Sequence, residues 1–140
     1  MKKTSLFALA LLALLNVAAI FETYTYLEPA QFKAWLESGK QMVIVDIQEK
    51  PAFAAHHFRG SIETNAYPVD TEEQRKQLNP AVAAAKQSGQ EVVIVCPRGG
   101  GGAKKTFSYL KSQGLAAEKL FILTGGEEKW PYREMLQGGK

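Results

Sequence analysis

An apolar run that leads directly into a cysteine and four glycines constrains the fold of this chain most. Residues 92–95 read Val-Val-Ile-Val, Cys96 follows at once, and Gly99–Gly102 precede a segment of helical character. A continuous apolar run of this length is typical of a strand that is covered on both faces, as in a parallel sheet. The sequence therefore predicts a buried strand, a glycine loop and a helix in succession.

The rest of the chain alternates between segments of strand and helix character. A second apolar run, Met-Val-Ile-Val-Asp-Ile within residues 41–47, predicts another buried strand. The other expected elements are a β-rich segment at 23–26, a helix from Pro29 to near Gly39, a short helix at 51–58, helical residues 71–88 with a break at Asn79-Pro80, a helix from near Ala103 to Gly114 and a strand at 120–123. This alternation predicts an α/β fold with a parallel sheet.

Size, charge and cysteine content exclude several classes of protein. With 140 residues, 46% of them hydrophobic, the chain has room for one domain with a sizeable core. The net charge of +3 comes without a concentrated basic stripe, so we expect no nucleic-acid partner. Cys96 is the one cysteine, which rules out an internal disulfide and a multi-cysteine metal site, and we expect no metal.

The first residues have the pattern of a secretory signal. Lys2-Lys3 supplies positive charge, an almost unbroken apolar stretch follows, and Val17-Ala18-Ala19 places small residues where a signal peptidase cleaves. We expect a signal peptide at residues 1–19, one domain at residues 20–140, export to the periplasm and no stable membrane association after cleavage. The alternatives are an uncleaved anchor, although the apolar stretch falls short of the ~20 residues of a membrane span, and a buried N-terminal helix.

The glycine loop is suited to hold an anion and to activate Cys96. Glycines tolerate positive φ and let successive backbone N–H groups turn toward a common centre, and a helix that begins near Ala103 adds its positive dipole end. We expect these N–H groups to lower the pKa of the Cys96 thiol, with Arg98 either adding its charge or facing solvent. The alternatives are an inert buried cysteine and a flexible glycine linker.

Four motifs in the same order resemble the rhodanese family over residues 24 to about 132. They are Val45-Asp46-Ile47, similar to the family's Asp-Val-Arg; His57-Phe58-Arg59-Gly60-Ser61, similar to Gly-His-Ile-Pro-Gly-Ala; the Cys96 loop with the helix to Leu115; and Leu123-Thr124-Gly125-Gly126 with Trp130, similar to Leu-x-Gly-Gly and its downstream Trp. The resemblance implies a three-layer α/β fold, with a central, mostly parallel sheet flanked by helices.

The resemblance also implies that the chain is a sulfurtransferase. Cys96 would accept a sulfane sulfur as a persulfide, from thiosulfate or a similar donor, and pass it to cyanide or a thiol. This is covalent catalysis by an activated nucleophile, and it requires no cofactor. The substrate-binding residues that the resemblance implies are those of the loop, Pro97, Arg98, Gly99, Gly100, Gly101, Gly102 and Ala103.

The loop is one glycine longer than the spacing usual in the family that the chain resembles. A longer loop resembles those of dual-specificity phosphatases and arsenate reductases, which place an arginine six residues after the cysteine. This chain has Gly102 there, so such an enzyme is the weaker alternative. A non-catalytic rhodanese-like binding module is the other alternative, and an ordinary alkylation profile of the thiol, rising near pH ~8.5, would favour it.

Other departures concern residues outside the loop. Gln48 stands where the family often has Arg, His56 replaces a Gly and Arg59 a Pro. We expect Asp46 to tether a neighbouring loop and His56 and His57 not to share a metal, because adjacent residues on a helix point about 100° apart. Side chains expected in the core are Trp35, Phe107 and Trp130, and Lys104-Lys105 is expected either to steer anions or to be solvated.

Overall fold

The structure, a computed structural model, describes residues 22–139, so the predicted signal peptide lies outside the described residues. Within that range no helix is both long and apolar enough to cross a membrane. The strands are β1 (Tyr26–Leu27), β2 (Val43–Asp46), β3 (His57–Phe58), β4 (Ile62–Glu63), β5 (Val92–Val95), β6 (Leu120–Leu123) and β7 (Leu136–Gln137). The α-helices are α2 (Pro29–Glu37), α3 (Lys50–Ala55), α4 (Glu72–Lys76), α5 (Asn79–Ser88) and α6 (Gly101–Ser112), with 3-10 turns at Ala117–Lys119 and Arg133–Met135.

A five-stranded parallel sheet forms the centre of the molecule, in the order β1-β6-β5-β2-β4. Strand β5 lies between β2 and β6, with Val95 beside Asp46 and Ile94 beside Ile122. All four residues of β2 and of β5 are buried, as the two apolar runs predict. The predicted α/β class is confirmed, and the residue that follows β5 is carried into the middle of the sheet's carboxyl edge.

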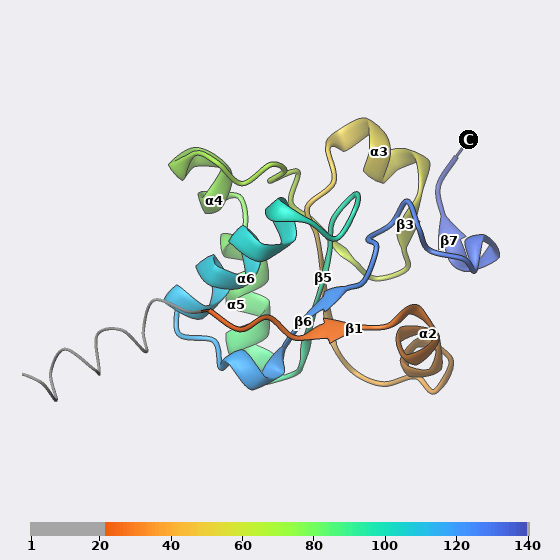
Figure 1. Ribbon diagram of the computed structural model, residues 1–140, viewed down its shortest axis with the longest axis horizontal. Helices are drawn as coiled ribbons and strands as arrows, with labels where there is room; N and C mark the ends of the chain where they lie inside the picture. Colours follow the sequence, from red (N-terminus) through yellow and green to blue (C-terminus); the bar gives the residue numbers. More distant parts are fainter. Residues whose placement is uncertain (1–21, 140) are drawn as a thin grey trace, which may run out of the picture.

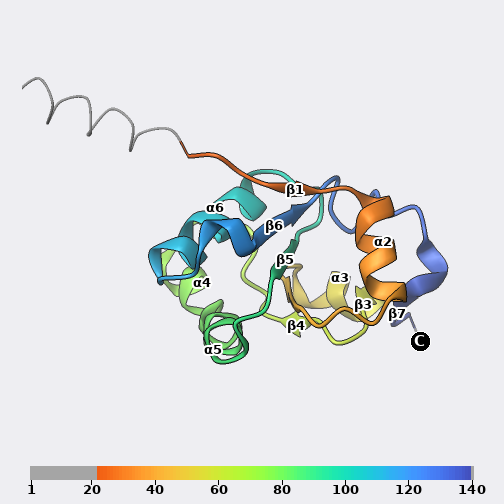
Figure 2. The ribbon, with the colours of Figure 1, turned by 90° about the horizontal axis from the view of Figure 1, so that it is seen from below.

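Helices cover both faces of this sheet (Figures 1 and 2). On one face α5 and α6 pack against the sheet, with Val82 of α5 and with Phe107 and Leu110 of α6 in a buried cluster that includes Cys96. On the other face Phe32 of α2 belongs to a second buried cluster, whose other members are Leu27, Ile44, Phe58, Val93, Val95, Leu123 and Trp130. The molecule therefore has three layers, with the sheet in the middle.

The helix expected at 51–58 ends early. Helix α3 stops at Ala55, His56 is extended, and His57–Phe58 forms β3, which pairs antiparallel with β7. Phe58 is buried edge-on against Phe32 and Trp130. The long-range pairing and this aromatic contact outweigh the local helical pattern, which carries no information about a partner strand far along the chain.

The remaining helices agree with the sequence pattern to within a few residues. Helix α4 begins with a capping box between Thr71 and Gln74, and α5 begins at Asn79-Pro80, where a break is predicted. Helix α6 begins at Gly101, two residues before Ala103, where the sequence places its start. Strand β1 at Tyr26–Leu27 is shorter and lies later than the β-rich segment at 23–26.

Of the three aromatic residues expected in the core, two are fully buried. Phe107 and Trp130 are 1% exposed, whereas Trp35 is half-buried, edge-on to Phe121 and covered by the ammonium group of Lys40. The imidazole Nδ1 of His57 lies 2.8 Å from the carbonyl oxygen of Phe53, and its ring stacks on the Phe53 ring. Among the described residues no three His, Cys, Asp or Glu side chains are grouped to hold a metal.

Candidate active site around Cys96

Cys96 lies at the carboxyl end of β5, where open parallel sheets gather their ligands. Its side chain faces the α5–α6 side of the sheet, in the buried cluster that also contains Ile47 and Ala103. The residue is only 2% exposed. The nucleophile predicted from the sequence is therefore at the expected place in the fold, but solvent hardly reaches it in this conformation.

The loop after Cys96 directs backbone amides at the sulfur atom. The N–H of Gly99 donates to Sγ at 2.7 Å. The backbone amides of Arg98, Gly100 and Ala103 also favour the anionic form of the sulfur. We call residues 97–103 the amide cradle. This arrangement of N–H groups is the one expected for a loop that binds and stabilises an anion.

Burial and the amide cradle have opposite effects on the pKa of the thiol. Loss of solvent around the sulfur is the larger effect and raises the pKa of Cys96 above its usual value, while the amide hydrogen bonds lower it. The sequence-based expectation of a lowered pKa is therefore wrong in its net direction. The expectation failed because the glycine pattern predicts the backbone amides around the sulfur but not the side chains that bury it.

The four glycines serve different needs. Gly99 has φ of +72°, and a Cβ there would lie 2.8 Å from the backbone nitrogen of Gly125. Gly100 and Gly101 have no atom within 4 Å of such a Cβ and no positive φ. Gly102 is buried, and a Cβ on it would lie 3.0 Å from the Tyr67 ring and 3.1 Å from Ile47. Thus glycine is needed at position 99 for the positive φ and the close backbone contact, and at position 102 to leave room for the Tyr67 ring.

A second segment, residues 125–128, holds the cradle in place. Glu127 N–H donates to the carbonyl oxygen of Cys96 at 2.8 Å, and Glu128 N–H donates to that of Pro97 at 3.0 Å. A Cβ on Gly126 would lie only 2.2 Å from the Cys96 oxygen. The Gly-Gly pair noted in the sequence thus permits close backbone contact with the cradle, a role that the sequence analysis did not assign to it.

Tyr67 closes one side of the cradle. Its backbone N–H donates to the carbonyl oxygen of Ile47 at 2.9 Å, which fixes it beside the end of β2, and its ring lies against Gly102. Position 102 is where the phosphatase-type loop carries an arginine, and here that space is occupied by the Tyr67 ring and Ile47. Sequence reasoning missed Tyr67 because it comes from a loop remote from Cys96 in the chain.

A small cavity of about 270 Å³ opens beside Pro97 and Arg98. We call it the mouth. It is lined by Gln48, Glu49, Ala52, Tyr67, Pro97, Arg98, Glu127 and Glu128. The guanidinium group of Arg98 faces solvent and lies 3.4 Å from the Glu128 carboxylate, with the Arg98 side chain 73% exposed. Of the two roles open for Arg98, the solvent-facing one is seen here.

Asp46 and Gln48 form a buried polar pair behind the mouth. The backbone N–H of Gln48 donates to one carboxylate oxygen of Asp46 and its side-chain amide to the other, both at 2.9 Å. The same amide also donates to the His56 carbonyl oxygen at 3.0 Å, so Asp46 tethers the turn after β2, as expected. Burial raises the pKa of Asp46 to about 6, against the effect of these hydrogen bonds.

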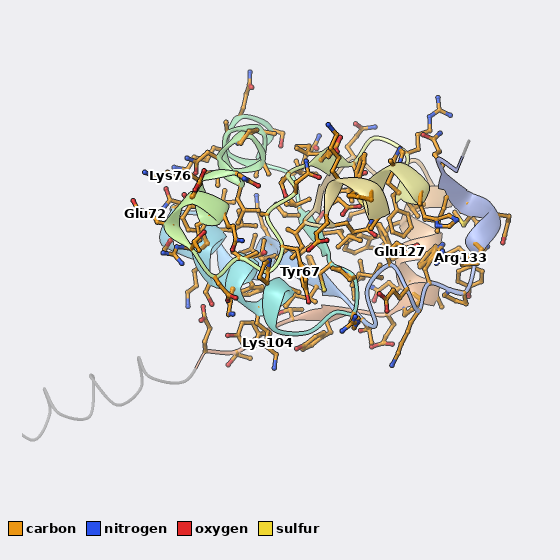
Figure 3. All side chains as sticks on the ribbon, turned by 90° about the horizontal axis from the view of Figure 1, so that it is seen from above. Tyr67, Glu72, Lys76, Lys104, Glu127 and Arg133 are labelled. Carbon is orange, nitrogen blue, oxygen red and sulfur yellow. The ribbon has the colours of Figure 1, made fainter. Side chains whose placement is uncertain are left out.

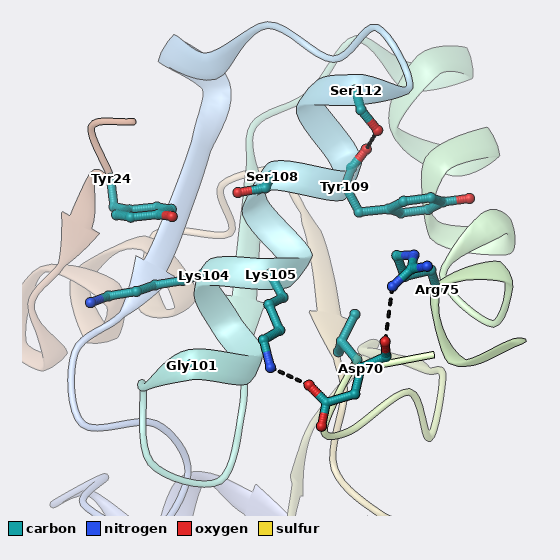
Figure 4. Close-up of a pocket in the computed structure, with 10 residues that line it drawn as sticks. Tyr24, Asp70, Arg75, Gly101, Lys104, Lys105, Ser108, Tyr109 and Ser112 are labelled. Atoms are coloured by element: carbon teal, nitrogen blue, oxygen red, sulfur yellow. Dashed lines mark hydrogen bonds and ion pairs between the residues drawn. The ribbon is translucent and has the colours of Figure 1, made fainter. Parts of the chain in front are cut away.

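A larger cavity of about 830 Å³ lies along the outer face of α6 and is separate from the mouth (Figure 4). Lys104 and Lys105 line it, and the Lys105 ammonium group pairs with the Asp70 carboxylate. Lys104 lies over the ring of Tyr24, with 5.6 Å between its nitrogen and the ring centroid. Neither lysine is directed at Cys96 by any contact in the described residues.

The fold and the site define the chain as an α/β protein with a buried cysteine at the carboxyl end of a central parallel strand, enclosed by a loop of backbone amides. The sequence pattern of the Rhodanese-like domain matches residues 28–131. The chain therefore belongs to the rhodanese family, as its motifs indicate. No curated protein sequence matches the chain.

Solved structures agree on the fold. A rhodanese-like domain protein from Staphylococcus aureus is 21% identical with a TM-score of 0.60, and the match covers 83% of this chain and 99% of that one. The As-Sb reductase from Leishmania major is 18% identical with a TM-score of 0.61, covering 83% and 86%. Thiosulfate sulfurtransferase from Pseudomonas aeruginosa is 20% identical with a TM-score of 0.59, covering 84% of this chain but 20% of that one. At these identities the likeness shows the fold alone.

Proposed function

We propose that the protein is a sulfurtransferase that carries a sulfane sulfur as a persulfide on Cys96. The thiolate attacks the outer sulfur of thiosulfate or a similar donor, the S–S bond of the donor breaks, and its electron pair leaves with sulfite. Cyanide or a thiol then attacks the outer sulfur of the persulfide and regenerates the Cys96 thiolate. The chain would need no cofactor for these two steps.

The observation that carries this proposal is the amide cradle. Gly99 N–H donates to the sulfur at 2.7 Å, the amides of Arg98, Gly100 and Ala103 also favour its anionic form, and no comparable surroundings are needed for a cysteine that only fills the core. Preorganised amides stabilise an anionic sulfur without having to reorient during the reaction. The cradle can therefore hold the thiolate before attack and an anionic persulfide after it.

The test is the mass of the intact protein after exposure to thiosulfate. We expect one added sulfur atom on the wild type, its loss on addition of cyanide, and no addition to the Cys96→Ser variant. Because Cys96 is the one cysteine of the chain, any added sulfur is assigned without peptide mapping. A wild type that gains no sulfur and forms no thiocyanate from cyanide would refute the proposal for this donor.

A binding module without catalysis is the second candidate, and the burial of Cys96 favours it. Alkylation of the thiol does not separate the two candidates, because burial raises the pKa of Cys96 in either case. Sulfur loading does separate them: a binding module stays unmodified by every sulfane donor. A protein that loads sulfur and releases it to an acceptor in repeated turnovers excludes the binding module.

Export completes the proposal. The apolar N-terminal segment and the small residues up to Ala19 support cleavage after that residue and release into the periplasm. Expression of the full chain in a Gram-negative host, followed by fractionation and N-terminal sequencing, tests this. We expect a periplasmic chain that begins near Ile20, and a chain that keeps its first residues in the membrane fraction would favour an anchor.

A further inference from the structure

The mouth, which Pro97 and Arg98 of the amide cradle line, carries an excess of negative charge. Three of its lining side chains are carboxylates, Glu49, Glu127 and Glu128, and Arg98 is its one cationic lining residue. Glu128 pairs with Arg98, which leaves little free positive charge at the entrance. A small cavity lined in this way repels a dianion and attracts a cation.

The three carboxylates differ in how they are compensated. Glu127 is buried and lies 2.8 Å from the guanidinium group of Arg133 (Figure 3). Glu128 has Arg98 at 3.4 Å. Glu49 is exposed at the start of α3, makes no side-chain capping hydrogen bond, and pairs with no cation among residues 22–139. Glu49 is therefore the carboxylate that is free to take a charge from a ligand.

The cavity also limits the size of the ligand. Its volume of about 270 Å³ corresponds to roughly nine water molecules at about 30 Å³ each and lies just below the usual range for small-molecule pockets. A short aliphatic donor fits this volume, whereas a large coenzyme thiol does not. Gln48 and Tyr67 supply further polar groups to the same wall.

We infer that the preferred sulfur donor is a small sulfane compound that bears an ammonium group, which Glu49 binds, and that dianionic thiosulfate is a poor donor. The inference rests on the proposed function, since it concerns the donor of the same cysteine. For a thiosulfonate donor, the Cys96 thiolate attacks the terminal sulfur, the donor S–S bond breaks and a sulfinate leaves with the electron pair. The products are the Cys96 persulfide anion and the sulfinate, so charge and atoms balance.

Three donors with the same reactive group and different charge test the inference. Thiosulfate carries two negative charges, methanethiosulfonate carries one, and 2-aminoethanethiosulfonate has no net charge because its ammonium group balances the anion. The rate of persulfide formation on Cys96 is measured for each by intact mass, in wild type and in Glu49→Gln. Glu118→Gln is the matched control, because Glu118 is exposed in the 3-10 turn before β6 and does not line the mouth.

In the wild type we expect the amino donor to react fastest and thiosulfate slowest. Glu49→Gln should lower the rate with the amino donor about fivefold relative to methanethiosulfonate and raise the relative rate with thiosulfate, as is typical of one exposed charge pair. Comparing each variant with wild type cancels the intrinsic reactivity of the donors. About 0.5 M salt should reduce the wild-type preference, because it screens the charges, and Glu118→Gln should preserve it.

The outcomes separate this inference from the proposed function. If no donor adds sulfur to Cys96, the proposed function itself fails. If the donors load Cys96 but Glu49→Gln changes the rates with the amino donor and with thiosulfate by the same factor, the ammonium-bearing donor is refuted while the sulfurtransferase stands.

Discussion

Replacing Asp46 by asparagine should change the way stability depends on pH. Asp46 is fully buried, and burial raises its pKa from 3.8 to about 6 in the folded protein. The fold therefore favours the protonated carboxyl, and its contribution to stability is fully present below pH 3.8 and is lost as the pH rises through about 6. A shift of about 2 pH units is worth about 3 kcal/mol at pH 7.

The Asp46→Asn variant lacks this ionisation but also disturbs a hydrogen bond. Its side-chain amide nitrogen would face the Gln48 amide that now donates to the Asp46 carboxylate, and this costs about 1 to 3 kcal/mol at every pH. We therefore predict a difference that depends on pH and is independent of this offset. The unfolding free energy of Asp46→Asn minus that of wild type should rise by about 2 kcal/mol between pH 4 and pH 7.

Urea denaturation followed by tryptophan fluorescence at several pH values measures this difference, with Trp130 buried as a reporter. The exposed Glu118 provides the control, since Glu118→Gln should track the wild type at each pH. A difference between Asp46→Asn and wild type that stays level from pH 4 to pH 7 would refute the claim that burial of an ionised Asp46 destabilises the fold.

Three further predictions concern the cradle and its neighbours. Gly99→Ala should lower the unfolding free energy by about 2 kcal/mol or more and slow sulfur loading from thiosulfate at least about tenfold, because it combines strain at φ +72° with a close contact to Gly125. The control is Gly89→Ala, where φ is +66° and the space is open. It should lower the unfolding free energy by about 1 kcal/mol and leave sulfur loading unchanged. The rate of Cys96 alkylation should keep rising with pH beyond the range of an unperturbed thiol, since burial raises its pKa, and a plateau near neutral pH in a stopped-flow titration would contradict this. Aryl phosphates should not be turned over, because Tyr67 and Ile47 lie against Gly102 where an anion-binding arginine would stand, and detectable aryl alcohol release that requires Cys96 would show otherwise.

The apolar runs predicted the central strands because both faces of the sheet are covered. Residues 92–95 and 120–123 coincide with β5 and β6, since each strand is apolar almost throughout and ends at a clear turn signal. The two-residue strands β3, β4 and β7 have no such pattern. They exist because a distant segment supplies their hydrogen bonds, as Leu136 does for Phe58, and local sequence does not reveal that partner.

In the candidate site, too, some features could be predicted from local sequence and others depend on distant segments. A cysteine after a buried strand, followed by glycines, is enough to predict a loop whose amides surround the sulfur, because only adjacent residues take part. The direction of the thiol pKa depends on burial in a cluster built from several elements, to which Ile47 and Phe107 belong. Glu49 and Tyr67 likewise reach the mouth from loops remote in sequence. Tertiary packing therefore determines the reactivity and charge of a site whose backbone is locally encoded.

A buried thiol with a raised pKa would have a chemical consequence in the proposed periplasmic location. Oxidation proceeds through the thiolate and requires access, so burial of Cys96 would protect it in an oxidising compartment, where the chain offers no second cysteine for an internal disulfide. The same burial slows attack on a donor at neutral pH. The amide cradle offsets that loss only for an anion seated at the sulfur, because the N–H groups act over hydrogen-bond distance. Under the proposed function, the site would thus combine low reactivity toward diffusing oxidants with stabilisation of an anionic persulfide, and the charge of the mouth would select the donor.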